Sequence, residues 1–330
     1  MIADARYVLP LRWHDDAGLP ELASYLQRLV EWIPVTVVDG SAPELFRAHA
    51  AAFPAAVVHL PPRPWPGGNG KVAGVMTGVA HAAEELLVLA DDDVRYTARE
   101  LERLVALLAE ADLVRPQNYF APLPWHARWD TGRILLNRAF GADYPGTVGV
   151  RRSRLLAAGG YDGDVLFENL ELMRTIRAAG GRQIVAGDLC VRRVPPSTRH
   201  FAGQRIRQAY DDFAQPARLL AELSLAPVIL WGARRPARLL LLVLTAIGAA
   251  WWGRRGAEAA FQRSAPLWAP AWVLERAVCV WLAVGYRLRG GVPYAGGRLK
   301  TAAHSAGELR RRHMAQRHAH QRGEDGTDHG

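Results

Sequence analysis

The stretch LLVLADDD, residues 86–93, decides how this chain can be interpreted. Five apolar residues with strand character run directly into Asp91, Asp92 and Asp93, and three adjacent carboxylates repel one another unless solvent, arginine or a cation offsets their charge. Side chains alternate along an extended segment, so Asp91 and Asp93 can point the same way while Asp92 points elsewhere. Such a pair can hold one Mg2+ or Mn2+ together with the phosphate oxygens of a nucleotide diphosphate. A solvated acidic turn is the alternative interpretation.

Short apolar runs alternate with helical patterns over the first half of the chain, which predicts an α/β fold with a mostly parallel sheet covered by helices. The expected strands are Tyr7–Leu9, Val35–Val38, Ala56–Leu60 and Leu86–Ala90, and the expected helices are Leu19–Trp32, Val72–Ala83 and Ala98–Glu110. The Pro-rich and Gly-rich residues 61–70 predict a loop. Ligands of such sheets bind at the carboxyl ends of the strands, where Asp39 and Asp91 both fall.

The charges divide the chain. Residues 1–200 are nearly neutral, whereas all of the net charge of +9 comes from residues 201–330. A basic surplus favours nucleic acid or an anionic membrane as partner. We favour the membrane and expect no nucleic-acid partner, because the same part contains long apolar runs and six of the 11 tryptophans, a residue that collects at lipid headgroups.

Three apolar stretches, residues 219–231, 239–252 and 266–286, follow the sheet domain. None gives 18 clean apolar residues, so they predict tilted short spans or interfacial helices, with buried helices of a soluble domain as the alternative. The expected organisation is a catalytic domain over residues 1–215, a membrane-associated helical region over 216–297 and a basic, disordered tail over 298–330. The chain opens without an apolar leader, so we expect the catalytic domain on the cytosolic face of the cell membrane.

Lysine is nearly absent from this chain, since Lys71 and Lys300 are its only lysines. A compact ammonium that follows a Gly-rich loop at the start of a helix can meet a phosphate or a base edge. An ordinary surface lysine near the helix start is the alternative. Because Lys71 precedes the three aspartates, both features can share one ligand.

Four blocks in order resemble the inverting nucleotide-sugar glycosyltransferases of family two, which have the GT-A fold. They are VVDGS (37–41), GGNGKVAGVMTGVAHAAEELLVLADDD (67–93), GTVGVRRSRLLAAGGYDG (146–163) and FENLELMRTIRAAGGR (167–182). The resemblance spans residues 6–213 and lies in the series of blocks, because each is weak alone. It implies a nucleotide-sugar donor and a divalent metal, Mg2+ or Mn2+.

The resemblance also implies roles for individual residues. Asp91 and Asp93 correspond to the DxD pair that carries the metal. Residues 200–208, HFAGQRIRQ, are similar to the QxxRW segment of membrane-bound members, in which an Arg fork offsets the charge of the diphosphate leaving group. The residues expected to bind the donor are Asp39, Lys71, Asp92, Gln204 and Arg207.

Two departures from the family pattern bear on the reaction. The Trp of the QxxRW segment is Gln208 here, which makes a single transfer more expected than chain-building synthesis. Asn169 stands where members carry the Asp that takes the acceptor's proton, and an amide cannot take up a proton at neutral pH. Glu168 is the nearest substitute, with Glu171 one helical turn on as second candidate. The alternative interpretation is that Glu168 only begins a helix, where an acid suits the dipole.

These features predict a membrane-attached, metal-dependent glycosyltransferase that inverts the sugar and uses a lipid-linked or glycan acceptor near the membrane. Two alternatives stand beside it. A polyprenyl-phosphate sugar synthase would use an acceptor that needs little help in losing a proton, in agreement with Asn169. A non-catalytic membrane protein could have kept the donor site and lost the base.

Overall fold

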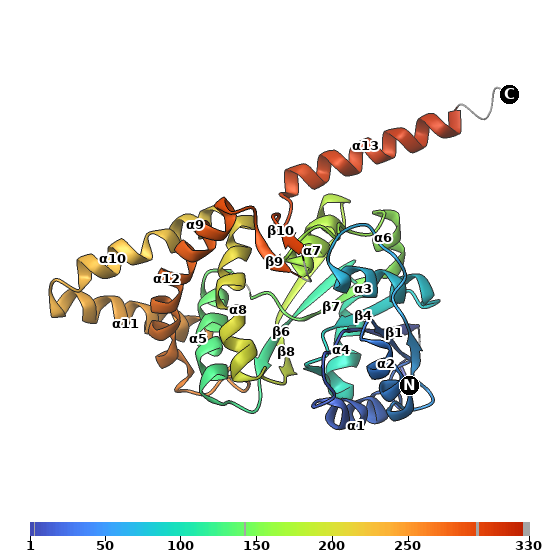
Figure 1. The fold of residues 1–330 in the computed structure, drawn as a ribbon, viewed down its shortest axis with the longest axis horizontal. Helices are drawn as coiled ribbons and strands as arrows, with labels where there is room; N and C mark the ends of the chain where they lie inside the picture. Colours follow the sequence, from blue (N-terminus) through green and yellow to red (C-terminus); the bar gives the residue numbers. More distant parts are fainter. Residues whose placement is uncertain (3, 142, 295–296, 326–330) are drawn as a thin grey trace.

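An eight-stranded mixed sheet lies at the centre of the computed structural model, which describes residues 1–2, 4–141, 143–294 and 297–325, with side chains to residue 315 (Figure 1). Its strands are β1 (Ala5–Leu11), β2 (Val35–Asp39), β3 (Val58–Leu60), β4 (Leu86–Ala90), β5 (Val94–Arg95), β6 (Leu113–Phe120), β7 (Thr147–Arg151) and β8 (Gln183–Arg193). Their order across the sheet is β3-β2-β1-β4-β7-β6-β8-β5. Only β7 and β5 pair antiparallel to their neighbours, so the mostly parallel sheet is confirmed.

Helices cover both faces of this sheet. They are α1 (Leu19–Leu29), α2 (Pro43–Ala52), α3 (Gly70–His81), α4 (Ala98–Leu107), α5 (Trp125–Ala139), α6 (Arg152–Ala157), α7 (Glu168–Ala178) and α8 (Thr198–Tyr210). A helical lobe beside the sheet adds η1 (Asp211–Ala214), α9 (Pro216–Leu223), α10 (Leu225–Gly232), α11 (Pro236–Gly253), η2 (Ala265–Trp268) and α12 (Ala269–Leu288). The chain then forms a small hairpin of β9 (Val292–Tyr294) and β10 (Gly297–Leu299), followed by α13 (Ala306–Asp325).

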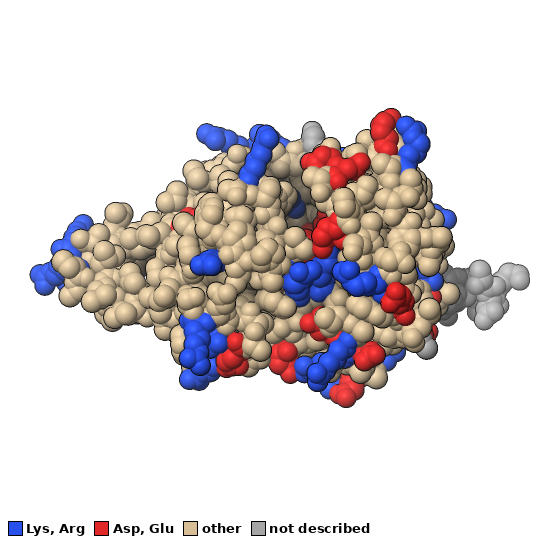
Figure 2. Space-filling view, turned by 90° about the horizontal axis from the view of Figure 1, so that it is seen from below, with Lys and Arg blue, Asp and Glu red and all other residues tan. Residues whose placement is uncertain are grey.

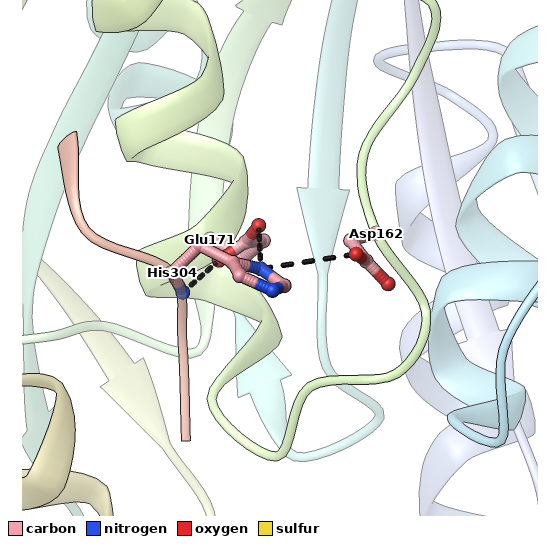
Figure 3. A group of neighbouring side chains, drawn as sticks. All are labelled: Asp162, Glu171 and His304. Carbon is pink, nitrogen blue, oxygen red and sulfur yellow. Dashed lines mark hydrogen bonds and ion pairs between the residues drawn. The ribbon is translucent and has the colours of Figure 1, made fainter. Parts of the chain in front are cut away.

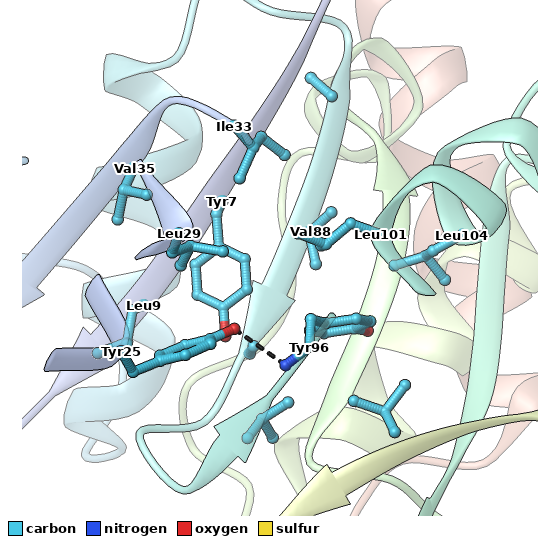
Figure 4. Packing of buried hydrophobic residues seen from close by; sticks show 14 of the residues in the cluster. Tyr7, Leu9, Tyr25, Leu29, Ile33, Val35, Val88, Tyr96, Leu101 and Leu104 are labelled. Atoms are coloured by element: carbon cyan, nitrogen blue, oxygen red, sulfur yellow. Dashed lines mark hydrogen bonds between the residues drawn. The ribbon is translucent and has the colours of Figure 1, made fainter. Parts of the chain in front are cut away.

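The central strands bury both of their faces because their side chains alternate between two cores. Tyr7 and Leu9 of β1 join one core, whereas Val8 between them joins the other. Figure 4 shows the first core, in which the Tyr25 hydroxyl accepts a hydrogen bond from the backbone N–H of Tyr96 at 3.0 Å. This double burial explains why Leu86–Ala90 reads as a continuous apolar run with no alternation.

Local turns set the ends of the predicted elements. The strand expected from Ala56 begins at Val58, because Val57 donates its N–H to the carbonyl of Pro54 at 2.9 Å and closes a turn there. Helix α3 begins at Gly70, where the side chain of Asn69 accepts the N–H of Lys71 at 3.1 Å. A Cβ at Gly78 would lie 2.3 Å from Val8, so glycine lets α3 pack closely on β1 and positions Lys71 at the edge of the sheet.

The helical lobe packs on the sheet domain rather than forming a separate unit. Its core combines Ile134 and Leu135 of α5 with Ala250 of α11 and Trp272 of α12. Helix α12 also contains Arg276, which is only 1% exposed and donates to Asp212 of η1 at 2.9 Å. By contrast, α10 and α11 extend away from the rest of the molecule as a hairpin (Figure 1).

Two helical segments are long and apolar enough to cross a membrane, Pro236–Gly253 and Ala265–Leu288, each with a mean hydropathy of 1.4. They differ in how much of them the protein covers, since 11% of the first window is buried against 39% of the second. The first is the exposed helix α11, and the second combines η2 with α12, which is fixed to the sheet domain by its charged side chains.

The expectation of a disordered tail over residues 298–330 is not met in the part that the structure describes, and residues 326–330 lie outside it. Strand β10 and helix α13 lie there. Ser305 accepts the N–H of Glu308 at 3.2 Å at the start of α13, and Arg312 pairs with Glu308 at 2.8 Å and with Asp162 at 2.9 Å. A helix start and ion pairs to a distant loop therefore hold a segment whose composition alone indicates disorder.

Candidate active site

Two carboxylates at the carboxyl end of β4 face one cation. Arg193, the last residue of β8, donates to Asp93 through Nε at 2.9 Å and through Nη2 at 2.6 Å. The same Nη2 lies 3.6 Å from Oδ2 of Asp91. Asp92 turns elsewhere and accepts a hydrogen bond from the indole N–H of Trp13. Asp91–Asp93 form a turn rather than the expected extended segment, since the N–H of Val94 donates to the carbonyl of Asp91 at 3.1 Å, and this turn together with the shared Arg193 brings the first and third aspartates together.

The start of β7 makes room for this group. Asp91 donates its N–H to the carbonyl of Gly146 at 2.8 Å, and a Cβ at Gly146 would lie 2.6 Å from Oδ2 of Asp91 and 3.0 Å from Arg193. The N–H of Gly146 is bound in turn by the Asn118 side chain at 2.8 Å. Any residue larger than glycine would displace either the carboxylate or the guanidinium.

Lys71 links the three aspartates to α7. Its Nζ lies 2.5 Å from Oδ1 of Asp91 and 2.5 Å from Oε1 of Glu168. Burial alone lowers the pKa of the ammonium, but Asp91 and Glu168 together raise that pKa above its ordinary value, so Lys71 stays charged. The loop, the lysine and the acidic triplet therefore meet at one place, although they are separate in sequence.

The two candidate bases point to different places. Glu168 is the first residue of α7 and its side chain is 12% exposed beside Lys71. Glu171 is fully buried and accepts hydrogen bonds from the N–H of His304 at 2.7 Å and from its Nδ1 at 2.9 Å (Figure 3). Asn169 donates its amide to the carbonyl of Pro145 at 3.1 Å. Glu168 alone of these three lies beside the acidic triplet.

Asp39 lies at the same edge of the sheet but is enclosed. Its Oδ2 contacts Nδ1 of His49 at 2.6 Å and Nε2 of His59 at 3.1 Å, and its Oδ1 accepts the N–H of Ser41 at 2.9 Å. Burial raises the pKa of this carboxyl, but the hydrogen bonds from His59, Ser41 and His49 outweigh it and hold the pKa well below its ordinary value. Asp39 therefore stays ionised within its own network, with its side chain fully covered.

Helix α8 contributes the two residues of the QxxR segment. Gln204 contacts the ring of His200, and the guanidinium of Arg207 stacks on Tyr294, with its carbon 4.8 Å from the ring centre. The Tyr294 hydroxyl donates to Oδ1 of Asn69 at 3.0 Å. Arg207 is thereby held near the start of α3, where Lys71 lies.

Three residues of the site had no place in the sequence prediction. Arg193 ends strand β8 at the same sheet edge as Asp91. Because ligands of such sheets bind at the carboxyl ends of the strands, a sequence prediction of β8 could have identified Arg193 as a site residue. Asp211 directly follows the QxxR helix, and burial raises its pKa to about 8 while Arg207 lowers it. Its Oδ1 has no hydrogen-bond partner among the residues described. No sequence signal pointed to Tyr294, which comes from the far C-terminal hairpin.

The charge of this cluster is not balanced. Within 4 Å, and among the residues described, the carboxylates of Asp91, Asp93 and Glu168 share two cationic partners, Lys71 and Arg193, and the carboxylate of the adjacent Asp92 has none. Burial accordingly raises the pKa of Asp93 even though Arg193 lowers it. A divalent cation matches the formal charge of −2, and carboxylate oxygens directed at one point are the ligands that Mg2+ and Mn2+ prefer. The residues present therefore fit a metal held by Asp91 and Asp93.

Residues 22–154 match the family model described as glycosyl transferase family 2. None of the curated proteins compared matches the sequence. Among solved structures, a mannosyltransferase from Pyrobaculum calidifontis in complex with GDP-Man and Mn2+ is 20% identical, with 84% of this chain and 87% of that chain covered and a TM-score of 0.47.

Two further solved structures are more distant. GalNAc-T7, in complex with UDP, GalNAc and Mn2+, is 12% identical, with 59% of this chain and 43% of that chain covered and a TM-score of 0.41. Mannosyl-3-phosphoglycerate synthase from Rubrobacter xylanophilus is 12% identical, with 60% and 69% covered and a TM-score of 0.39.

Proposed function

Because residues 22–154 match the model of glycosyl transferase family 2, we propose that this chain belongs to that family and transfers a sugar from a nucleotide-sugar donor to an acceptor at a membrane, with inversion at the anomeric carbon. The observation that carries the proposal is the single cluster in which Lys71 bridges Asp91 and Glu168 while Arg193 bridges Asp91 and Asp93. It combines a metal-binding pair, fixed cations and a carboxylate at the edge where sheets of this type bind ligands.

The leaving group requires charge stabilisation. Asp91 and Asp93 would hold Mg2+ or Mn2+, which when bound supplies a Lewis acid for the departing diphosphate. Arg207 supports the same charge from α8, and its stacking on Tyr294 fixes the direction of the guanidinium. Lys71 remains charged beside Asp91 and adds a further cation that needs no reorganisation during the reaction.

The acceptor hydroxyl must lose a proton as its oxygen bonds to the anomeric carbon. Glu168 is the carboxylate of the cluster that lies on α7, apart from the two metal-binding aspartates, and it can take that proton. Asn169 cannot do so, and its amide is already bound to Pro145. In a one-step displacement the new bond forms opposite the leaving diphosphate, so the configuration of the sugar inverts.

The helical lobe supports attachment to a membrane. Figure 2 shows the α10–α11 hairpin as a surface almost free of charged side chains, with arginines gathered at its tip. Trp231 stacks with Arg238 at that tip, and Trp251 and Trp252 stack with Arg254 and Arg255 at the other end of α11. Such pairs suit the headgroup layer, where an aromatic ring and a cation are both stable. We place the catalytic domain on the cytosolic face of the cell membrane.

A second candidate is a polyprenyl-phosphate sugar synthase. The observation that favours it is the engagement of Asn169 with a backbone carbonyl, which leaves its position without a base. An ionised phosphate acceptor has no proton to lose, so this reaction would not need Glu168 as a base. A non-catalytic donor-binding protein is the remaining alternative, and turnover alone excludes it.

Turnover of nucleotide sugars by the full-length protein in a neutral detergent tests the proposal. We expect release of nucleoside diphosphate from a matching donor with Mn2+ or Mg2+, and a loss of about 100-fold or more in Asp91→Asn and Asp93→Asn. The matched control is Asp188→Asn, because Asp188 pairs with Arg103 on the surface. Release that persists in both variants, or that does not depend on the metal, would contradict the proposed site.

A further inference from the structure

A large apolar cavity lies between the helical lobe and the sheet domain, apart from the acidic cluster. Its volume is about 980 Å³, at the upper end of the 300–1,000 Å³ typical of ligand sites. One wall is the face of α11 that presents Leu242, Thr245, Ala246 and Ala249 at helical spacing. The facing walls come from α9, α10 and α12.

Two guanidinium groups close the inner end of this cavity. Arg115 of β6 stacks on Tyr144 with its carbon 4.7 Å from the ring centre, and Arg174 of α7 donates to the carbonyls of His304 and Ala214 at 2.7 and 2.8 Å. Neither forms an ion pair with a carboxylate of the residues described. The only hydrogen bond from Arg115 among them goes to the sulfur of Met173 at 3.7 Å, and its Nε has no partner.

One carboxylate acts on each of these cations from beyond ion-pair distance, and both carboxylates have other partners. Asp143, which acts on Arg115, is engaged by Arg133 at 3.2 Å and by the amide of Asn137 at 2.7 Å, and Glu171, which acts on Arg174, is engaged by His304 at 2.9 Å. Burial lowers the pKa of both Arg115 and Arg174, which reflects the cost of two cations beside apolar walls. An anion placed between them would remove that cost and gain charge-assisted hydrogen bonds.

The two ends of the cavity differ in chemistry. The outer end runs between the arms of the α10–α11 hairpin, past Val228, Ile229 and Leu242, and that hairpin is the most exposed apolar part of the molecule. The inner end reaches Tyr144, which is two residues before Gly146, the residue that packs against Asp91. A long apolar ligand with one anionic end matches this gradient.

We propose that this cavity binds a lipid phosphate, with the phosphate at Arg115 and Arg174 and the hydrocarbon chain between the arms of the hairpin, and that this lipid is the sugar acceptor. The acceptor role rests on the second candidate under the proposed function, in which the acceptor is a phosphate and Glu168 is not required as a base. In the transfer, an oxygen of the lipid phosphate bonds to the anomeric carbon as the bond from that carbon to the donor diphosphate breaks. The diphosphate leaves with the electron pair, and the products are a lipid phosphosugar and a nucleoside diphosphate.

Titration of the full-length protein in a neutral maltoside detergent tests the site. Three probes are compared. Dodecyl phosphate has both a hydrocarbon chain and an anionic phosphate, dodecanol has the hydrocarbon chain alone, and inorganic phosphate has the anion alone. We expect saturable binding of dodecyl phosphate only, with a rise in Tm of about 2–4 °C at saturation. Arg115→Gln should weaken that binding about tenfold or more, because it removes the charge and keeps a polar side chain.

A second variant tests the part of the cavity that would hold the hydrocarbon chain of the lipid rather than its phosphate. Ala246→Trp fills the cavity from α11 and should abolish binding, whereas Leu244→Trp adds an indole to the exposed face of the same helix and should not. Arg177→Gln is the control for Arg115, since Arg177 lies on α7 outside the cavity lining. Equal binding of dodecanol, or equal affinity in Arg115→Gln and Ala246→Trp, would overturn the site.

Mass spectrometry of the same mixtures with Mn2+ and a donor that the protein turns over tests the acceptor role. A gain of one sugar by dodecyl phosphate, lost in Ala246→Trp, supports it. Binding without transfer, in a preparation that releases nucleotide from the donor, would identify a membrane lipid and overturn the acceptor role. Absence of nucleotide release from every donor would instead contradict the proposed function, and the binding result would stand.

Discussion

The edge of the sheet at β4 and the α10–α11 hairpin differ in what they expose. The sheet edge has more carboxylates than cations, and the hairpin has apolar side chains that no other described part of the protein covers. At the sheet edge the carboxylates of Asp91, Asp93 and Glu168 share two cations within 4 Å, among the residues described, and the adjacent Asp92 has no cation within that distance. On the hairpin large apolar side chains face outward, with Leu241 64% exposed and Leu244 54% exposed. Uncompensated charge and uncovered apolar surface are both unfavourable in water. We propose that each region has a partner outside the chain, a metal with a diphosphate for the first and a bilayer for the second.

The largest effect should come from Glu168→Gln, which asks whether the charged cluster performs chemistry or only holds the fold together. Gln keeps the shape and a hydrogen bond to Lys71 but cannot take a proton. We expect transfer to a hydroxyl acceptor to fall by about 100-fold to 10,000-fold, with donor affinity within a few-fold of wild type. Initial rates at saturating donor and acceptor measure it.

A comparison of a hydroxyl acceptor with a phosphate acceptor tests whether Glu168 acts as a base. If the acceptor is an ionised phosphate, the same variant should retain most of its activity, because no proton is removed. A Glu168→Gln enzyme that is fully active toward a hydroxyl acceptor would show that this carboxylate only anchors Lys71.

The next effect concerns the buried ion pairs inside the helical lobe. Arg276 of α12 is buried with Asp212 at 2.9 Å and Glu222 at 3.5 Å. Arg276→Met removes one of the two cations that these carboxylates share, the other being Arg218 at 2.8 and 2.9 Å, and we expect a loss of about 3 kcal/mol in the free energy of unfolding. Burial already raises the pKa of Glu222 to about 8 while Arg276 opposes it, so protonation of Glu222 should relieve part of the loss.

Chemical unfolding of the full-length protein in detergent measures this change, with Arg289→Met as control because Arg289 is exposed beyond the end of α12. A loss no larger than that of the control would mean that the lobe is held by apolar packing alone.

The sequence predicted the parts of the site that depend on local order. Strand Leu86–Ala90 was predicted with its observed bounds, and the loop, Lys71 and the acidic triplet meet because helix and strand geometry determine their positions. The partners of these groups depend on long-range pairing. Arg193 reaches Asp93 from a strand that ends 100 residues later, and its position at the end of that strand indicates the shared sheet edge but not the pairing with Asp93.

Glu171 shows the same limit. Its spacing from Glu168 is one helical turn, yet its carboxylate is buried and bound by His304, which comes from a C-terminal segment that packs on α7. The tail was predicted as disordered for a related reason. Its composition is polar and charged, and what orders the part described is an ion pair with Asp162, far away in sequence.

The third prediction concerns the exposed α10–α11 hairpin. Charges placed on it should change the binding of the protein to membranes more than they change the free energy of unfolding. Leu241→Glu with Leu244→Glu places two charges on a surface that contacts little of the protein. We expect a change of less than about 1 kcal/mol in unfolding. Each charge at the centre of an inserted helix costs about 2.5–3.5 kcal/mol, so the variant should leave the membrane.

Flotation with anionic vesicles measures that partitioning. Leu156→Glu, at an exposed leucine of α6 in the sheet domain, is the matched control and should float as wild type does. Equal flotation of the double variant would mean that the hairpin is not the part that binds lipid.

The smallest effect concerns the segment that returns from the helical lobe to the sheet domain. Leu166 and Phe167 donate to the carbonyls of Thr301 and Ala302 at 3.0 and 2.8 Å, immediately before Glu168. His304 then bonds to Glu171, and Asp162, Glu308 and Arg312 also face its ring. The hydrogen bond to Glu171 raises the pKa of His304 above its ordinary value of 6.5, whereas burial and Arg312 lower it.

Because the pKa of His304 is higher in the folded protein than in the unfolded chain, its contribution is fully present below about pH 6.5 and is lost as pH rises through the folded value. We expect amide exchange of residues 299–306 to accelerate between pH 6 and pH 9, beyond the intrinsic base-catalysed increase, by an amount equivalent to about 1 kcal/mol or less. His304→Gln should remove this extra dependence. If the wild type lacks it as well, the segment is held by its backbone hydrogen bonds to Leu166 and Phe167 and not by the imidazolium, and Glu168 would then keep its position on α7 regardless of pH.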